Sequence, residues 1–222
     1  MKRIIFHLPF TPYMSIIHIL LLLVLIFFPG IVGLAFIRIG LPPWSIALVL
    51  LISLVGSFVN IVIREKMVSV DVEPILPPIL HYLFDIPPIR IRRRQILAIN
   101  VGGGIIPTMV AIYVATRLPL LQFLVSLIIL SVLVNRLSKV VQGMGIVVPG
   151  IIPPILAVLL AYLLYPQAAP PLAFSSGVLV TLLGADIMNL NKLGDMPGLV
   201  SIGGAGVFDG IYLTGVLAAL LA

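Results

Sequence analysis

Long apolar stretches follow one another along almost the whole of this chain. Hydrophobic residues make up 61% of the 222 residues and charged residues only 9%, which is more apolar side chain than a water-soluble fold of this length can bury. The sequence therefore predicts an all-α polytopic protein of the plasma membrane, in a single membrane domain over residues 1–222. About seven transmembrane helices are expected, because seven stretches approach the length of about 20 residues that a crossing helix needs: 15–36, 43–63, 96–116, 118–134, 146–165, 171–190 and 199–221.

The distribution of Lys and Arg predicts an orientation for these helices. If the N-terminus lies in the cytoplasm, the cytoplasmic segments hold eleven Lys and Arg residues, whereas the outer loops hold only Arg38 and Arg117. Cytoplasmic loops of membrane proteins carry an excess of such residues. We therefore expect the N-terminus inside and the C-terminus outside.

The loop 64–95 is the largest segment between the apolar stretches. EKMVSVDVE and PIRIRRRQ alternate apolar and polar residues, which predicts two short strands paired at the cytoplasmic surface. The basic residues of this loop are expected to hold it inside and to contact anionic lipid headgroups rather than nucleic acid. The residues concerned are Arg90, Arg92, Arg93 and Arg94.

Two halves of the chain resemble each other. PPWSIALVLLISLVGSFVN and PPLAFSSGVLVTLLGADIMN carry a proline pair and a glycine, Gly56 or Gly184, at the same separation, and INVGGGIIPTMV is similar to SIGGAGVFDGI. This similarity predicts a parallel internal repeat, with halves 15–117 and 146–222 joined by a linker span, 118–139. Interrupted spans at matching positions of two halves often mark a central site in transporters.

Two acidic residues stand inside the last two apolar stretches. Asp186 lies in GADIMNL and Asp209 lies in SIGGAGVFDGIYLTG, and neither stretch holds a Lys, Arg or His. A carboxylate in lipid is costly unless it is paired, hydrated or protonated. Since adjacent antiparallel helices would bring the two acids to similar depth, we expect them to share one proton and to be the catalytic residues of an intramembrane site.

Small and polar residues are expected to surround this aspartate pair. Glycines near Asp209 would let a substrate backbone approach, and asparagines and a threonine would complete a polar core. No cofactor and no metal are expected, because the chain has no cysteine and its histidines, His7, His18 and His81, are scattered. The predicted substrate-binding residues are Gly203, Gly204, Gly206, Gly210, Asn189, Asn60, Asn100 and Thr214.

GADIMNL, SIGGAGVFDGIYLTG, NVGGGIIP and VVPGIIPPI together resemble an uncharacterised membrane family, the domain-of-unknown-function 1614 family. That resemblance implies a polytopic membrane protein and no particular activity. A weaker resemblance is to presenilin-type intramembrane aspartyl proteases, which carry one catalytic aspartate in each of two neighbouring spans. It implies catalytic roles for Asp186 and Asp209.

Three functions remain open on the sequence. The first is an intramembrane aspartyl-protease-like hydrolase acting on transmembrane peptides. The second is a small proton-coupled transporter of a small solute, with a polar site at the membrane midplane that includes Asn60 and Asn100. The third is a non-catalytic membrane scaffold in which the acids only order the helices.

Overall fold

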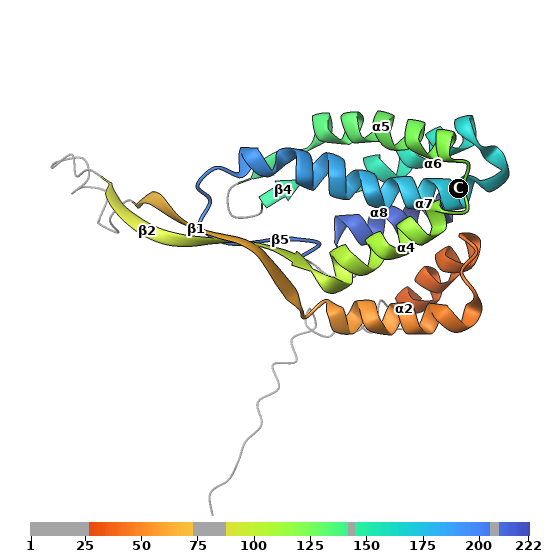
Figure 1. The fold of residues 1–222 in the computed structure, drawn as a ribbon, viewed down its shortest axis with the longest axis horizontal. Helices are drawn as coiled ribbons and strands as arrows, with labels where there is room; N and C mark the ends of the chain where they lie inside the picture. The colour runs from red at the N-terminus through yellow and green to blue at the C-terminus, as the bar shows by residue number, and fades with distance from the viewer. Residues whose placement is uncertain (1–26, 73–87, 142–144, 205–208) are drawn as a thin grey trace, which may run out of the picture.

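A bundle of helices with a β-sheet arm at one end makes up the described part of the molecule (Figure 1). The computed structural model describes residues 27–72, 88–141, 145–204 and 209–222. Helix Phe27–Arg38 precedes the labelled helices, which are α2 (Pro43–Gly56), α4 (Ile106–Ala115), α5 (Leu120–Leu137), α6 (Ile152–Leu164), α7 (Ala169–Val180) and α8 (Gly210–Leu221). Shorter helical segments adjoin them: η1 (Val101–Ile105), η2 (Pro166–Ala168), η3 (Thr181–Asp186) and η4 (Ile187–Leu193).

Two long strands form the arm. β1 (Asn60–Val72) and β2 (Ile89–Asn100) pair antiparallel over their whole length, from Asn60 opposite Asn100 to Val72 opposite Ile89. β5 (Gly198–Ile202) lies parallel to β2 on its other side, which gives the strand order β1-β2-β5. A second sheet consists of the short strands β3 (Lys139–Val141) and β4 (Gly145–Val147). The predicted strand pair of loop 64–95 is thus confirmed in its described part, and its strands are longer than expected.

The prediction of an all-α protein with seven spans is wrong. Four of the predicted spans are divided between strand and helix: 43–63 ends in β1, 96–116 begins in β2, 146–165 begins in β4 and 199–221 begins in β5. The helices left over are short; α6 has 13 residues and rises about 20 Å at 1.5 Å per residue, whereas the hydrocarbon core measures about 30 Å. The predicted orientation, with the N-terminus inside and the C-terminus outside, assumed seven crossings and is therefore no longer supported.

Two of the described helices are long and apolar enough to cross a membrane. One is Leu120–Leu137, and the other is the continuous helical segment Pro166–Leu193, which joins η2, α7, η3 and η4. Of the predicted first span, residues 15–26 lie outside the described residues, and the rest belongs to helix Phe27–Arg38. The length and composition of these two helices suggest association with a membrane.

The helix α7 occupies the centre of the bundle. Its residues 172–180 are all buried, as expected for a helix that is apolar on every side. Three aromatic rings meet beside it: the centroid of Phe36 lies 6.1 Å from that of Phe174, edge to face, and 6.3 Å from that of Tyr212. The helix Phe27–Arg38 and α8 are therefore packed together against α7.

The two glycine-rich sequences that resemble each other are in backbone contact. A Cβ atom added to Gly203, whose φ is +72°, would lie 2.5 Å from the backbone nitrogen of Gly104. A Cβ added to Gly102 would lie 1.9 Å from the carbonyl oxygen of Ser53 in α2. Glycine at these positions lets the end of β5, η1 and α2 approach one another. The contact does not test the predicted internal repeat, which stays a prediction.

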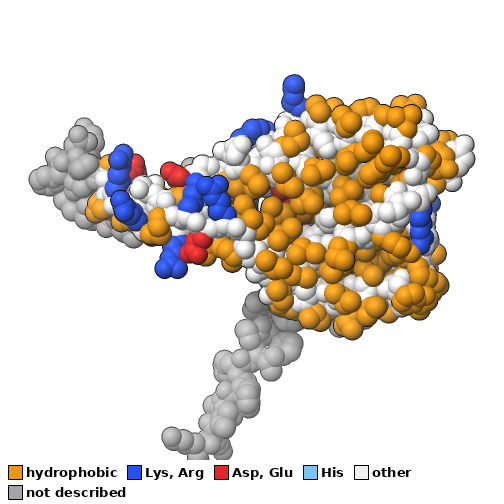
Figure 2. Space-filling view, in the orientation of Figure 1, with side chains coloured by type: hydrophobic (Ala, Val, Ile, Leu, Met, Phe, Trp, Pro, Cys, Tyr) orange, Lys and Arg blue, Asp and Glu red, His pale blue; other side chains and the backbone are white. Residues whose placement is uncertain are grey.

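The surface of the molecule divides into two chemical regions. Large hydrophobic side chains are exposed on most helices, including Trp44, Leu121, Ile128 and Leu163. Figure 2 shows this apolar cover over the helical body, with Lys and Arg side chains gathered on the arm. The exposed apolar side chains of the helical body suggest contact with a membrane, and most of the charged side chains lie on the arm.

Candidate functional site

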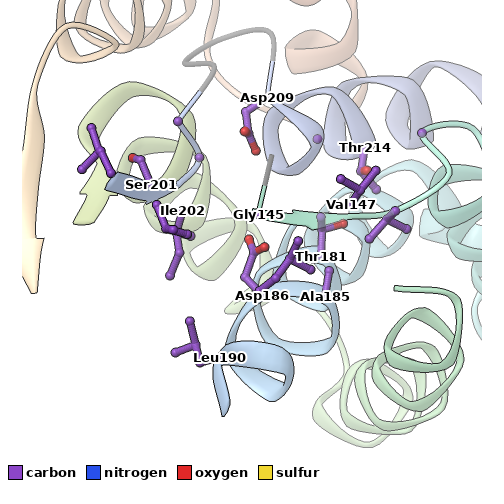
Figure 3. Close-up of a pocket in the computed structure, with 18 of the residues that line it drawn as sticks. Gly145, Val147, Thr181, Ala185, Asp186, Leu190, Ser201, Ile202, Asp209 and Thr214 are labelled. Carbon is purple, nitrogen blue, oxygen red and sulfur yellow. The ribbon is translucent and has the colours of Figure 1, made fainter. Parts of the chain in front are cut away.

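A cavity of about 530 Å³ lies between η3, β4, β5 and the start of α8. Both Asp186 and Asp209 line it, and their side chains enter it from opposite sides (Figure 3). The structure therefore brings the two predicted acidic residues to one site.

Asp186 is the last residue of the π-helix η3, between α7 and η4. The close contact of η3 with α5 fixes this segment: a Cβ on Gly184 would lie 2.7 Å from the carbonyl oxygen of Ser131, and the side-chain amide of Asn135 donates to the Gly184 carbonyl at 3.1 Å. Thr181 stands five residues before Asp186, one π-helical turn away, and it also lines the cavity. The hydroxyl of Thr181 donates to the Gly177 carbonyl at 2.9 Å, so the wide turn brings Thr181 and Asp186 to the same cavity wall.

Asp209 is the N-cap of α8. Its backbone is extended, with φ −72° and ψ 154°, and its Oδ1 accepts a hydrogen bond from the backbone N–H of Ile211 at 3.0 Å. This is the ordinary arrangement of an N-cap aspartate. The residues just before it, 205–208, lie outside the described residues.

The electrostatics of the cavity are set by these two acids. No Lys, Arg or His is among its described lining residues. Two like charges in one cavity without a cation favour a state in which the pair holds a proton.

The other predicted site residues divide into two groups. Gly203, Gly204, Gly210 and Thr214 line the cavity, and Gly206 lies outside the described residues. Asn60, Asn100 and Asn189 are not among its described lining residues.

The three asparagines are held in hydrogen bonds elsewhere. Asn100 donates to Asn60 Oδ1 at 3.2 Å and to the Ser57 carbonyl at 2.8 Å, and its Oδ1 accepts from the backbone N–H of Gly103 at 2.9 Å. Asn189 donates to the carbonyls of Gly184 and Ala185, at 3.1 and 2.7 Å. These bonds tie together the junction of α2, β1 and η1, and the turn around Asp186.

Several residues that line the cavity were not predicted from the sequence. They include Thr181, Ser201 and the strand β4. Thr181 could have been found from its spacing to Asp186 on one helical segment, but nothing in the sequence Gly145–Val147 indicates that β4 would lie opposite β5. Ser201 donates its hydroxyl to Asn60 Oδ1 at 2.6 Å, which joins β5 to β1 across the sheet.

Among the described residues there is no group of three or more His, Cys, Asp or Glu side chains that could hold a metal ion. The three histidines, His7, His18 and His81, lie outside the described residues. The predicted lack of a metal and of a cofactor therefore stays a prediction.

A family model described as "Protein of unknown function (DUF1614)" matches residues 54–221 of the chain. No curated protein and no solved structure matches it, and the resemblance to presenilin-type proteases is not supported. The matched segment contains both aspartates and every described wall of the cavity. The family model matches well over half of the chain, and the chain therefore belongs to the DUF1614 family.

Proposed function

We propose that this chain is a membrane hydrolase in which Asp186 and Asp209 together activate water to cleave a peptide bond. The observation that carries the proposal is that both carboxyl groups line one cavity of about 530 Å³ whose described walls hold no cation. Paired carboxyl groups that share a proton are the arrangement by which aspartic proteases work. The cavity volume is within the range of about 300–1,000 Å³ typical of ligand sites.

The apolar surface of the helical body supports a location in the membrane. Leu120–Leu137 and Pro166–Leu193 are the helices that we expect to cross it, and the plasma membrane is the expected compartment. The arginines of the arm, Arg90, Arg92, Arg93 and Arg94, remain candidates for contact with anionic headgroups.

A strand edge that lines this cavity favours an extended peptide as the substrate. Among the described strands, β5 is the outer strand of its sheet and is paired with β2 alone, and its residues Leu199, Val200, Ser201 and Ile202 line the cavity. A peptide in extended conformation could add to such an edge through main-chain hydrogen bonds. This edge is the reason that we favour a peptide over a small solute as substrate.

In the proposed reaction one carboxyl group is ionised and the other holds the proton. The ionised group takes a proton from water as the water oxygen bonds to the peptide carbonyl carbon, and the protonated group donates a hydrogen bond to the carbonyl oxygen. The tetrahedral intermediate then collapses, the C–N bond breaks and a proton passes to the leaving nitrogen. No outside reagent other than water is needed.

The transporter interpretation is less favoured by the geometry. It required Asn60 and Asn100 to join the aspartates in a common polar site, and both are instead engaged in hydrogen bonds at the base of the sheet. The scaffold interpretation has one observation in its favour, which is the capping bond from Ile211 to Asp209.

The test is peptide cleavage by the purified full-length chain in detergent micelles. A mixture of synthetic transmembrane peptides serves as substrate, and mass spectrometry identifies the products. We expect Asp186→Asn and Asp209→Asn each to lower the cleavage rate about 100-fold or more, since each removes half of the acid–base pair.

The matched control is Asp71→Asn, which removes an acid that pairs with Arg90 on the arm at 3.0 Å and does not line the cavity. It should cleave at the wild-type rate. Cleavage that persists in either cavity variant would refute the proposal. Proton-coupled solute uptake into liposomes that depends on the same two acids, without any cleavage, would favour the transporter.

A further inference from the structure

A second cavity, of about 270 Å³, lies where the arm meets the helical body. It is unlike the aspartate cavity, because its charged lining residues are cations. Its walls are Arg64, Lys66, Gln95 and Leu97 of the arm, Val200 of β5, and Leu190, Asn191, Leu193 and Gly194 in and after η4.

The pairing of the strands explains why these residues meet. Leu97 stands opposite Arg64 on one side and Val200 on the other. Gln95 stands opposite Lys66 and Gly198 in the same way, two residues along. Residues in register share a face of the sheet, and so do residues two apart on a strand. Arg64 and Lys66 therefore project from one face.

The segment after η4 covers that face and is fixed to it by hydrogen bonds. The buried side chain of Gln95 donates to the carbonyls of Met196 and Gly194, at 2.6 and 3.3 Å. Lys66 Nζ donates to the same Gly194 carbonyl at 3.1 Å. Hydrogen bonds thus hold the segment after η4 to the strands of the arm that form the opposite wall of the cavity.

The charges of the arm leave a positive excess at this cavity. Arg90 pairs with Asp71 at 3.0 Å and Arg94 with Glu65 at 3.3 Å, both outside the cavity. Lys66 pairs with Asp195 at 3.3 Å, and an ammonium group has a third donor to offer. Arg64 takes part in none of the ion pairs between described residues, and no carboxylate is among the described walls.

The apolar walls narrow the class of ligand. Four of the lining residues are apolar, namely Leu97, Leu190, Leu193 and Val200. On β1 the exposed side chains of Ile61, Val62 and Ile63 come directly before Arg64, so the cavity stands at the border between the apolar surface and the charged arm. An anion attached to an apolar chain would contact both the cations and the apolar walls of the cavity, whereas a fully hydrated inorganic anion would contact the cations alone.

We propose that this cavity binds the phosphate of an anionic phospholipid, with Arg64 and Lys66 as its charged partners and Asn191 as a further donor. The proposal rests on the membrane location given under the proposed function and is independent of hydrolysis. The volume of about 270 Å³ suits a headgroup better than a whole substrate. The headgroup would also contact Leu190 and Val200, which are walls of the aspartate cavity as well.

Lipid binding by the full-length chain in a neutral detergent tests the proposal. Dihexanoyl phosphatidic acid is titrated against the protein, with dihexanoyl phosphatidylcholine and inorganic phosphate as separate arms, and binding is followed by native mass spectrometry and thermal stabilisation. We expect phosphatidic acid to bind most tightly. We expect Arg64→Gln with Lys66→Gln to weaken that binding roughly tenfold or more, because two charge-assisted hydrogen bonds are lost.

The matched control is Arg136→Gln with Lys139→Gln, which removes the same net charge from exposed residues outside the cavity and away from the arginines of the arm. It should change binding less than about twofold, as expected for exposed charges away from the ligand. Equal loss in both double variants would overturn the site, and equal binding of phosphatidylcholine would overturn the need for an anion. Inorganic phosphate binding as tightly as the lipid would overturn the choice of a phospholipid.

A second variant guards against misfolding. Arg64→Gln alone changes a side chain with no ion pair among the described residues, so the fold should be kept. Unchanged lipid binding in a folded Arg64→Gln protein would also refute the proposal. Peptide cleavage is measured in the same preparations, so that loss of lipid binding and loss of hydrolysis are scored separately.

Discussion

At the scale of single residues, Gly102 leaves the least room for a side chain among the described glycines. An added Cβ would lie 1.9 Å from the carbonyl oxygen of Ser53 and 2.5 Å from the backbone nitrogen of Ser57. Both contacts are to backbone, which cannot move aside as a flexible side chain could. We therefore expect Gly102→Ala to lower the free energy of unfolding by about 1–3 kcal/mol or more, measured by denaturant unfolding in detergent.

The control for this prediction is Gly150→Ala, at a position where an added Cβ meets nothing within 4 Å. It should leave the free energy of unfolding within about 0.5 kcal/mol of the wild-type value. If Gly102→Ala were as stable as Gly150→Ala, the close approach of η1 to the end of α2 would be wrong.

At the scale of elements, the N-cap residue of α8 has one observed role and one proposed role. Asp209 caps the helix through its bond to Ile211, and the proposed chemistry needs its carboxyl group as one member of the acid–base pair. Asn caps a helix about as well as Asp, whereas Ala costs about 1 kcal/mol. We expect Asp209→Ala to lower the melting temperature in detergent by about 2–4 °C.

Asp209→Asn should instead melt at the wild-type temperature or above it, because it keeps the cap and removes a negative charge from the cavity that Asp186 also lines. Circular dichroism during heating measures both variants. Equal melting of all three proteins would show that the cap contributes nothing. A stable but inactive Asp209→Asn protein would separate chemistry from capping.

At the scale of the whole molecule, the apolar cover of the helical body is the feature that suggests association with a membrane. Ile128 is 64% exposed near the middle of α5. An acid at the centre of a crossing helix costs about 2.5–3.5 kcal/mol on the insertion scale. We expect Ile128→Asp to reduce the fraction of protein that stays in membranes after alkaline extraction, measured by immunoblot of pellet and supernatant.

Met67→Asp is the companion variant, because Met67 on β1 is 60% exposed, similar to Ile128. The arm is expected to lie in water, so this change should leave the membrane fraction unaltered. A chain that is fully extracted without any substitution would contradict the membrane location, and so would equal losses from both variants.

Local pattern was enough for some elements and not for others. The alternation in residues 65–73 and 88–95 predicted the paired strands, because period two is a property of a single strand. The apolar stretch 43–63 could form either helix or strand, since Ile61, Val62 and Ile63 suit both. These residues form a strand because Ile61 pairs with Ile99 and Val62 pairs with Ala98. A single sequence does not reveal those partners.

The candidate site shows the same division. Asp186 and Asp209 could be singled out because ionised groups are rare in apolar stretches. The expected roles of Asn60 and Asn100 did not fit the geometry, because their amides bond to each other and to nearby backbone. An asparagine gives the same signal in a sequence whether its amide meets a ligand or a neighbouring carbonyl.

Composition and short-range period were sufficient to predict an apolar surface, basic residues concentrated in residues 64–95 and two acids within apolar stretches. They could not predict that β4 and β5 complete the aspartate cavity or that Arg64 and Lys66 line another one. The reason is that each cavity is bounded by elements far apart in the chain, and their meeting depends on strand register and on glycine contacts such as that between Gly203 and Gly104.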